Sequence, residues 1–472
     1  MRLLPSVTPT PEQLKVLADV KPGFRIIRGA AGSGKTTTAL LRLREQIAVR
    51  LNRRRRRGDE APVRVLVLTF NRTLQGYISE LAHRSAPDDD ALDLEISTFA
   101  RWARSLVGDV DILDRNQVSS FLRPHLRGVV PSKSLDFFVD EVGYALGRFA
   151  PGDLSGYLDV VREGRGRAPR VGRRLRDRLL EEVLPAYAAA KAESGTIDWN
   201  DLALLAAEAE PDCLYDVVIV DEAQDFSANQ VRAVMRHLHG EHNTTFVLDA
   251  VQRIYPQFFK WSEVGIGARP ETIYTLRENY RNTAAIAAFA YPLVEGLPLE
   301  DDGTLPDFTA CRRAGAKPVV VAGKYSGQLR VMLDRLDKAA DLRTESVALL
   351  KPRGGRWFDE ARRMLADRGI PCCELTRENE WPTGPENVAL CTIHSAKGLE
   401  FDHVLLPGLS QQVTPHGPDD GDADLDRLRR MLAMAVGRAR VSVMIGYKPG
   451  EESSLIDLLN PSTYELVEVN GA

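Results

Sequence analysis

A run of eight residues, Gly29–Thr36, restricts the possible folds of this chain more than any other part of its sequence. The run reads Gly-Ala-Ala-Gly-Ser-Gly-Lys-Thr and fits the pattern GxxxxGK[ST]. It follows the apolar run Phe24–Ile27 and precedes the helix-forming stretch Thr37–Ala48. A glycine-rich turn between a buried strand and a helix lets backbone N–H groups converge on a phosphate, and the start of the helix adds positive potential. The pattern therefore predicts an α/β domain that binds a nucleoside triphosphate.

The individual residues of this P-loop have expected contacts with ATP and Mg²⁺. Lys35 should reach the β- and γ-phosphates, and the Thr36 hydroxyl should bind Mg²⁺. The other phosphate-binding candidates are Gly29, Gly32, Ser33 and Gly34.

An acidic pair after a second apolar run supplies the other half of an ATP-hydrolysing site. Val217–Val220 reads as a buried strand, and Asp221 and Glu222 follow it directly. Asp221 is expected to reach the Mg²⁺ shell, and Glu222 is placed to polarise the attacking water.

Short, nearly continuous apolar runs recur along the chain, as in parallel sheets whose strands are buried on both faces. One set lies before about residue 275 and a second after about residue 315, which predicts two α/β domains. The runs are Phe24–Ile27, Val63–Leu68, Val217–Val220, Phe246–Leu248, Val319–Ala322, Val347–Leu350, Val388–Cys391, Val404–Leu406 and Val441–Ile445.

Length and composition agree with this division. A chain of 472 residues suits two to four domains, and 44% hydrophobic with 27% charged residues is typical of soluble globular proteins. The net charge of −4 does not exclude nucleic-acid binding, because a local basic stripe is sufficient. Arg53–Arg57 and the arginines of 162–178 are such stripes, although a solvated surface explains the first equally well. No signal peptide or membrane span is recognisable, so a cytoplasmic location is expected.

Helical periodicity dominates between Phe99 and Trp199, with no convincing strand. We expect a helical insertion in the first α/β domain. The predicted domains are 1–98 and 197–275 for the two parts of the first α/β domain, 99–196 for the insertion, and 276–472 for the second α/β domain.

A series of motifs, in order along nearly the whole chain, resembles superfamily 1 helicases of the UvrD/Rep group. Asp221-Glu-Ala-Gln-Asp225 resembles that family's DEAQD element, and Thr392–Phe401 (TIHSAKGLEF) is very close to its TxHxAKGLEF. The remaining matches are Thr10–Gln13, Val67–Asn71, Ile96–Phe99, Ile197–Leu202, Leu248–Tyr255, Leu276–Arg281 and Arg429–Arg440.

The resemblance implies two RecA-like domains with ATP between them. Gln13 would read the adenine edge, Tyr280 would stack on adenine, and Gln252 would sense the γ-phosphate. Arg281 and Arg438 would reach the γ-phosphate from the second domain. Thr37, Gly398 and Glu400 complete the residues expected at the nucleotide.

The same resemblance implies a single-stranded DNA track, with 3′→5′ polarity. Tyr255, Phe258 and Trp261 follow Gln252 and are candidates for base stacking. Burial in the core is an equally good explanation for Phe258, and a weaker one for Tyr255 and Trp261. The other expected track contacts are Thr69, Phe70, Asn71, Thr98, Phe99, Thr392 and His394.

The chain departs from the family pattern at several points. Thr37 stands where many members have an adenine-stacking arginine, so adenine selectivity is either looser or depends on Gln13 and Tyr280. Gly437 replaces a usual threonine, and Ala100 replaces a usual histidine. Only about a dozen residues separate the apolar segments at 372–375 and 388–391, where family helicases carry a large accessory insertion. No nuclease signature is recognisable.

Three functional hypotheses follow. The first is an ATP-dependent translocase or helicase on single-stranded DNA or tailed duplex. The second is an ATP-gated nucleic-acid clamp or signalling module, with protein partners in a repair or defence complex and no processive unwinding. The third, a small-molecule kinase or plain NTPase, leaves the motifs after residue 275 unexplained.

Overall fold

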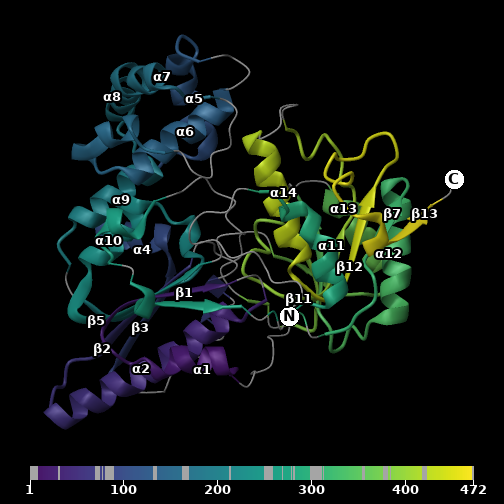
Figure 1. Ribbon diagram of the computed structural model, residues 1–472, viewed down its shortest axis with the longest axis horizontal. Helices are drawn as coiled ribbons and strands as arrows, with labels where there is room; N and C mark the ends of the chain where they lie inside the picture. Colours follow the sequence, from purple (N-terminus) through teal and green to yellow (C-terminus); the bar gives the residue numbers. More distant parts are fainter. Residues whose placement is uncertain are drawn as a thin grey trace.

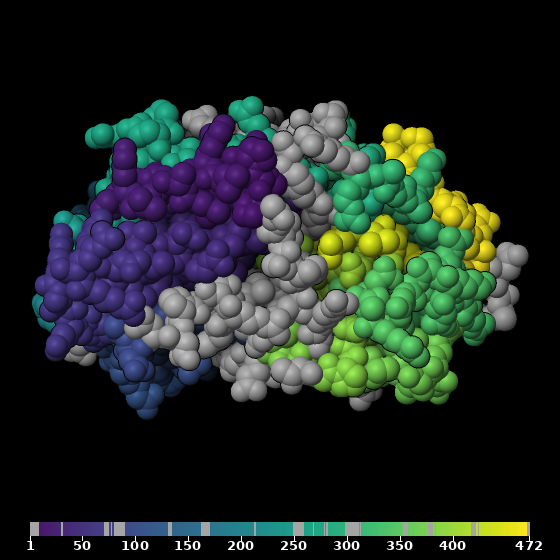
Figure 2. Space-filling view, turned by 90° about the horizontal axis from the view of Figure 1, so that it is seen from below, coloured from purple at the N-terminus to yellow at the C-terminus, as the bar shows by residue number. Residues whose placement is uncertain are grey.

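The computed structural model describes residues 9–29, 32–69, 75–76, 78–79, 90–130, 135–161, 170–211, 214–248, 259–267, 269–277, 279, 282–297, 311, 313–352, 357–375, 381–382, 384–416 and 422–469. Two α/β domains lie side by side, and a group of helices rises from the first (Figure 1). The space-filling view shows the same pairing from another side, with N-terminal residues on the left and C-terminal residues on the right (Figure 2).

The first domain is built on a six-stranded sheet of parallel strands in the order β3-β2-β4-β5-β1-β6. Its inner strands are rich in valine, isoleucine and leucine and are buried along most of their length, as expected for a sheet covered on both faces. The strands are β1 (Gly23–Gly29), β2 (Val63–Thr69), β3 (Leu92–Thr98), β4 (Tyr215–Val220), β5 (Leu238–Leu248) and β6 (Ile273–Leu276).

Helices cover both faces of this sheet. The longest, α2, starts at the P-loop lysine and ends at an arginine run whose members Arg53 and Arg54 pair with acidic residues of the same domain. The elements are α1 (Pro11–Ala18), α2 (Lys35–Arg57), α4 (Phe99–Val107), α9 (Trp199–Glu208), α10 (Ala228–Arg236), and the short turns η4 (Ala223–Asp225), η6 (Trp261–Val264) and η7 (Pro270–Thr272).

A helical subdomain with its own apolar core occupies the middle of the first domain's sequence. Within the described part of 99–199, the only pairing of β type is an isolated bridge between Ile112 and Ile197. The elements are α5 (Arg115–Leu126), α6 (Leu135–Arg148), η2 (Pro151–Leu158), α7 (Arg173–Arg178), η3 (Leu179–Val183) and α8 (Leu184–Ser194). Although we predicted that this insertion starts at residue 99, α4 packs against α9 and the core of the sheet. It therefore belongs with the first domain.

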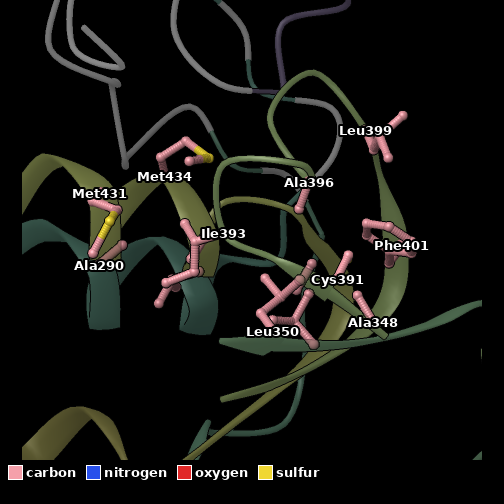
Figure 3. Packing of buried hydrophobic residues seen from close by; sticks show 14 of the residues in the cluster. Ala290, Ala348, Leu350, Cys391, Ile393, Ala396, Leu399, Phe401, Met431 and Met434 are labelled. Atoms are coloured by element: carbon pink, nitrogen blue, oxygen red, sulfur yellow. The ribbon is translucent and has the colours of Figure 1, made fainter. Parts of the chain in front are cut away.

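The second domain contains a seven-stranded parallel sheet in the order β13-β7-β12-β11-β8-β10-β9. One of its cores is closed by α11 and α14, where Ala290 faces Met431, and extends to Ile393 and Phe401 (Figure 3). The strands are β7 (Val319–Ala322), β8 (Val347–Lys351), β9 (Cys372–Glu374), β10 (Val388–Thr392), β11 (Phe401–Leu406), β12 (Ala439–Tyr447) and β13 (Glu465–Glu468); the helices are α11 (Ala284–Val294), α12 (Tyr325–Ala339), α13 (Trp357–Ala366) and α14 (Ala423–Val436), with η9 at Pro461–Thr463.

The predicted α/β class with two parallel sheets is confirmed, and each predicted apolar run lies in a strand. Strand β5 is longer than predicted. Its first half is polar and partly exposed, so the search for apolar runs did not detect it. β9 ends at Glu374 and pairs directly with β10, which begins at Val388. Among the described residues, no helix is long and apolar enough to cross a membrane.

Candidate nucleotide and nucleic-acid site

Three neighbouring strands of the first sheet bring the predicted nucleotide site together. β5 lies between β1 and β4, and all three run in the same direction. The P-loop leaves the end of β1, and Asp221 and Glu222 leave the end of β4. Because the carboxyl ends of parallel strands meet at one edge, residues about 190 positions apart in sequence share one site.

The described part of the P-loop has the backbone conformation that phosphate binding requires. Gly32 and Gly34 have positive φ angles of 83° and 77°, which favour glycine. A Cβ atom at Gly34 would lie 2.5 Å from Gln13 Nε2. The Lys35 ammonium folds back and donates to the Gly29 carbonyl at 2.8 Å. Ser33 is buried, and Thr37 is exposed at the start of α2.

Gln13 lies against the P-loop, where its predicted adenine contact needs it. It forms a reciprocal capping box with Thr10 at the start of α1, and its Nε2 lies 3.5 Å from the Ser33 carbonyl. Only 5% of Gln13 is exposed. The capping box fixes the direction of the Gln13 side chain, because its amide oxygen accepts from the Thr10 backbone while the Thr10 hydroxyl accepts from the Gln13 backbone.

Thr36 and Asp221 meet from opposite sides of the site. The Thr36 hydroxyl donates to Asp221 Oδ2 at 3.1 Å. Burial, followed by the charge of Glu222, raises the pKa of Asp221 to about 7. A hydroxyl and a carboxylate are hard oxygen ligands, and Mg²⁺ is commonly held by one or two such protein groups together with phosphate oxygens. These two side chains fit a Mg²⁺ ion.

Glu222 is the described non-glycine residue with a left-handed backbone, at φ 53°. Its carboxylate accepts from Gln224 Nε2 at 2.5 Å. Burial alone raises the pKa of Glu222, but the nearby cations Lys397, Arg438 and Lys35 outweigh it and hold the pKa below its ordinary value. Glu222 is therefore an ionised carboxylate beside the P-loop.

Two cations reach this acidic cluster from the second domain. Lys397 is buried, forms an ion pair with Asp225, and lies 3.8 Å from Glu222 Oε2. Arg438 is 2% exposed; its Nε donates to the Met434 carbonyl at 3.2 Å and its Nη1 to the Leu399 carbonyl at 3.3 Å.

The backbone on either side of Arg438 is also fixed. Asn282 donates to the carbonyls of Gly437 and Ala439 at 3.2 and 2.6 Å, and is itself hydrogen-bonded to Asn279. Gly398 follows Lys397 with φ 81°, and Glu400 is half-buried nearby in sequence. Lys397 and Arg438, from the last two motifs of the second domain, thus both act on Glu222 of the first.

The expected track residues have different surroundings. Thr98 caps α4 by accepting from the Arg101 amide at 3.3 Å, and Phe99 packs edge-on against Trp102 and Phe226 with 5% exposure. With only 5% of the residue exposed, this burial conflicts with the predicted DNA contact of Phe99. Thr98 is also buried, at 6% exposure, and its hydroxyl is used in the helix cap.

Other track candidates are also engaged within the protein. Trp261 is half-buried and its ring centroid lies 4.9 Å from that of Phe246, so part of the ring packs against the core, and its contact with the track stays a prediction. Thr69 is fully buried at the end of β2. Thr392 is half-buried and accepts from the Ser395 amide at 3.1 Å. Seven predicted residues lie outside the described part of the chain: Phe70, Asn71, Gln252, Tyr255, Phe258, Tyr280 and Arg281.

A cavity of about 280 Å³ lies where the helical subdomain faces the second domain, and His394 is part of its wall. Burial, together with Arg427, Lys397 and Arg115, lowers the pKa of His394 to about 4, so the ring is neutral at pH 7. Trp199, 43% exposed, also lines the cavity. We did not predict contacts for Trp199, Arg115 or Arg427. An aromatic at the start of α9 was the available signal for Trp199, whereas nothing in the sequence places the two arginines beside His394.

Comparison with known proteins gives two family matches. Residues 13–257 match a family described as an AAA domain, and residues 370–449 match the UvrD-like helicase C-terminal domain. The first match covers just over half of the chain, and the two together include both sides of the candidate site.

Individual relatives show the same similarity. A probable DNA helicase of Mycoplasma pneumoniae is 22% identical over 456 residues, which cover 91% of this chain and 81% of that protein. The ATP-dependent DNA helicase PcrA of Bacillus subtilis is 36% identical over 67 residues, which cover 14% of this chain and 9% of PcrA. The ATP-dependent DNA helicase srs2 of Schizosaccharomyces pombe is 31% identical over 86 residues, which cover 18% of this chain and 9% of srs2. The matched region thus spans a small part of two of these relatives. A solved C-terminal domain of a possible DNA helicase from Lactobacillus plantarum is matched over 40% of this chain and 98% of that domain, with 22% identity and a TM-score of 0.30.

Proposed function

The chain belongs to the UvrD/Rep-type superfamily 1 helicase family, and we propose that it is an ATP-dependent motor that hydrolyses ATP between its two α/β domains and moves along single-stranded DNA. The observation that supports this most directly is that Lys397 and Arg438 of the second domain both act on Glu222 of the first. A simple P-loop kinase or NTPase needs no second α/β domain at its acidic residues. A motor needs such a second domain, because ATP hydrolysis must change the relative position of two domains that both bind the nucleic acid.

The described residues of the first domain have clear roles in this proposal. The P-loop amides and Lys35 bind the phosphates, and Gln13 binds the adenine edge. Thr36 and Asp221 would hold Mg²⁺, which supplies charge neutralisation at the phosphates when it is bound. Glu222, ionised and aimed by its left-handed backbone, orients the attacking water and accepts its proton.

Arg438 is our proposed finger, an arginine that stabilises the charge of the transferring phosphoryl group. It reaches the Glu222 side of the site from the second domain, and its backbone is held by Asn282. An arginine in this role contributes about 10³–10⁵ in rate. Gln252, Arg281 and Tyr280 are proposed to act with it, by analogy with the family.

The proposal is tested first by the ATPase activity of the purified chain with and without a single-stranded oligonucleotide. We expect stimulation of severalfold or more, because DNA held on both domains favours the closed site. Absence of stimulation by DNA or RNA of any sequence would refute a nucleic-acid motor. Separation of a duplex with a 3′ tail, but not of one with a 5′ tail, is expected for 3′→5′ movement. Stimulation without strand separation would instead favour a clamp.

The finger assignment is tested by Arg438→Ala. We expect kcat to fall by about 10³ or more while the affinity for ATP changes little, since Arg438 acts on the transition state. Arg440→Ala is the matched control, because Arg440 is two residues away and pairs with Asp402 at 3.3 Å. Equal turnover in the two variants would assign the catalytic arginine elsewhere.

A further inference from the structure

The short helix α1 carries Gln13, the residue proposed to bind adenine, and contacts at both of its ends hold it in place. Eight residues are too few for a helix to be stable alone, and only Gln13 and Val16 of α1 are buried. Near its N-terminal end, Gln13 Oε1 accepts from the Thr10 amide at 2.9 Å, and Glu12 accepts from the Arg277 amide at 3.0 Å. The position of Gln13 therefore depends on what holds α1.

Arg42 holds the C-terminal end of α1. It lies on α2, the helix that begins at Lys35, and Figure 1 shows α1 beside α2. Its Nη1 donates to the Val16 carbonyl at 2.7 Å and also to the Asp19 carbonyl, both at the end of α1. Only 1% of Arg42 is exposed, and its Nε donates to the Thr245 hydroxyl of β5 at 3.2 Å.

The buried charge of Arg42 is used on backbone carbonyls. Burial lowers the pKa of Arg42 to about 10, so the guanidinium is still a cation at pH 7. Buried arginines usually pair with a carboxylate, but within the described part of the chain no carboxylate oxygen accepts a hydrogen bond from Arg42. A cation that donates to the last carbonyls of a helix caps that helix and interacts favourably with its dipole. The contacts of Arg42 are thus those that orient α1.

The residue that ends α1, Asp19, ties the helix to two strands of the first sheet. Its carboxylate accepts from Arg25 Nη2 of β1 at 2.9 Å and from the Tyr274 hydroxyl of β6 at 2.6 Å. Burial raises the pKa of Asp19, but the hydrogen bonds from Arg25 and Tyr274 outweigh burial and hold the pKa well below its ordinary value. The C-terminal end of α1 is therefore fixed to the sheet as well as to α2.

These contacts fix the distance between the base-binding and phosphate-binding parts of the site. Arg42 follows Lys35 by seven residues on the same helix. Seven residues of α-helix span about 10 Å. Because α2 is one continuous helix, the end of α1 is held at a set distance from the P-loop, and Gln13 is held with it.

The orientation of the Gln13 amide decides which base it accepts. Its Oε1 is held by the Thr10 amide, so the side chain cannot turn over to exchange oxygen and nitrogen. A carbonyl oxygen has a second lone pair, which can accept from the 6-amino group of adenine. The base of ITP has an oxygen in place of that amino group, and two acceptors facing each other repel. A displaced α1 would lose this distinction.

We propose that Arg42 is a positioning residue for nucleobase selectivity, which fixes α1 on the P-loop helix so that Gln13 accepts adenine and disfavours a 6-oxopurine. This inference rests on the proposed function, in which Gln13 binds the adenine edge. Arg42 acts through α1 and has no role in the chemical step.

The first experiment measures kcat and KM for ATP and for ITP. In Arg42→Met, the ratio of kcat/KM for ATP to kcat/KM for ITP should fall about three- to tenfold, the value of one neutral hydrogen bond. The change should lie in the KM for ATP, with kcat within about twofold of the wild type, because the P-loop and the acidic pair are unchanged. Arg42→Lys keeps a cationic donor for one carbonyl and should restore part of the ratio.

Two further variants separate positioning from general damage to the fold. Arg44→Met is the matched control on α2, because the Arg44 side chain is 53% exposed and pairs with Glu45; it should leave the ratio unchanged. Tyr274→Phe removes one hydrogen bond to Asp19 without changing α2, should lower the ratio about twofold or more, and carries the test if Arg42→Met does not fold. An unchanged ratio in Arg42→Met and Tyr274→Phe, or an equal rise in KM for both nucleotides, would overturn the inference.

The second experiment asks whether Arg42 acts through Gln13. Once Gln13→Ala is present, adding Arg42→Met should leave the ratio unchanged; a further fall of the same size would place the effect elsewhere and refute the inference. If Gln13→Ala lowers the ratio and Arg42→Met does not, only the role of Arg42 fails. If Gln13→Ala keeps the wild-type ratio, the adenine contact in the proposed function fails, and the role of Arg42 with it.

Discussion

The ion pair between Lys397 and Asp225 should be the most sensitive contact between the two domains. The side chains of Lys397, Asp225 and Glu222 are 2%, 0% and 10% exposed. Replacing Lys397 with methionine keeps the aliphatic length of the side chain and removes its charge, so two ionised carboxylates remain buried beside each other. Breaking a buried pair in this way costs about 3–5 kcal/mol of unfolding free energy.

Urea unfolding of the nucleotide-free protein measures this loss. Lys448→Met is the control, because Lys448 is 50% exposed and pairs with Glu451; it should cost less than about 1 kcal/mol. Adding Asp225→Asn to Lys397→Met removes one of the two unpaired carboxylate charges without changing the size of the side chain. The double variant should therefore recover part of the lost unfolding free energy. If Lys397→Met unfolds within about 1 kcal/mol of the wild type, the pair is not buried between the domains in solution and the argument is refuted.

Two further predictions concern aromatic and imidazole side chains. Trp261→Ala should lower the free energy of unfolding of the first domain by about 2–4 kcal/mol, because the ring packs on Phe246. Urea unfolding measures this loss, and anisotropy measures DNA binding. A DNA-binding defect without loss of stability would show that Trp261 contacts DNA. The lowered pKa of His394 means that the unfolded chain binds a proton between pH 6.5 and about 4 while the folded chain does not, so stability falls as the pH falls through this range. Between pH 7.5 and pH 5, the free energy of unfolding of His394→Gln should therefore fall by about 1–2 kcal/mol less than that of the wild type. Equal decreases for the two proteins in urea unfolding would contradict the lowered pKa of His394.

The sequence was sufficient to predict the strands that are buried on both faces, because such strands are continuous apolar runs. Strands at or beside sheet edges were harder to predict. β3 alternates polar and apolar residues, and β13 carries two exposed glutamates and an exposed leucine, so neither is a continuous run. The first half of β5 was missed for the same reason.

The nucleotide site was predictable where its chemistry depends on a local pattern, and not where it depends on packing. The P-loop and the acidic pair each lie within a few residues of one strand, so spacing alone identifies them. The ion pair of Lys397 joins residues 172 positions apart, and the cavity arginines come from separate domains. Burial of Phe99 was also invisible in sequence, since an aromatic after a strand suits both a core and a DNA surface.

The left-handed backbone at Glu222 has a consequence for any attempt to make this protein more robust. A non-glycine residue in this region is strained by about 1 kcal/mol or more, and glycine would relieve that strain. Selection for stability alone, in a laboratory screen or by automated redesign, would therefore favour loss of the carboxylate that we assign to water activation. Variants selected by such a screen would be more stable but would lose ATPase activity, so Glu222 should be excluded from mutagenesis.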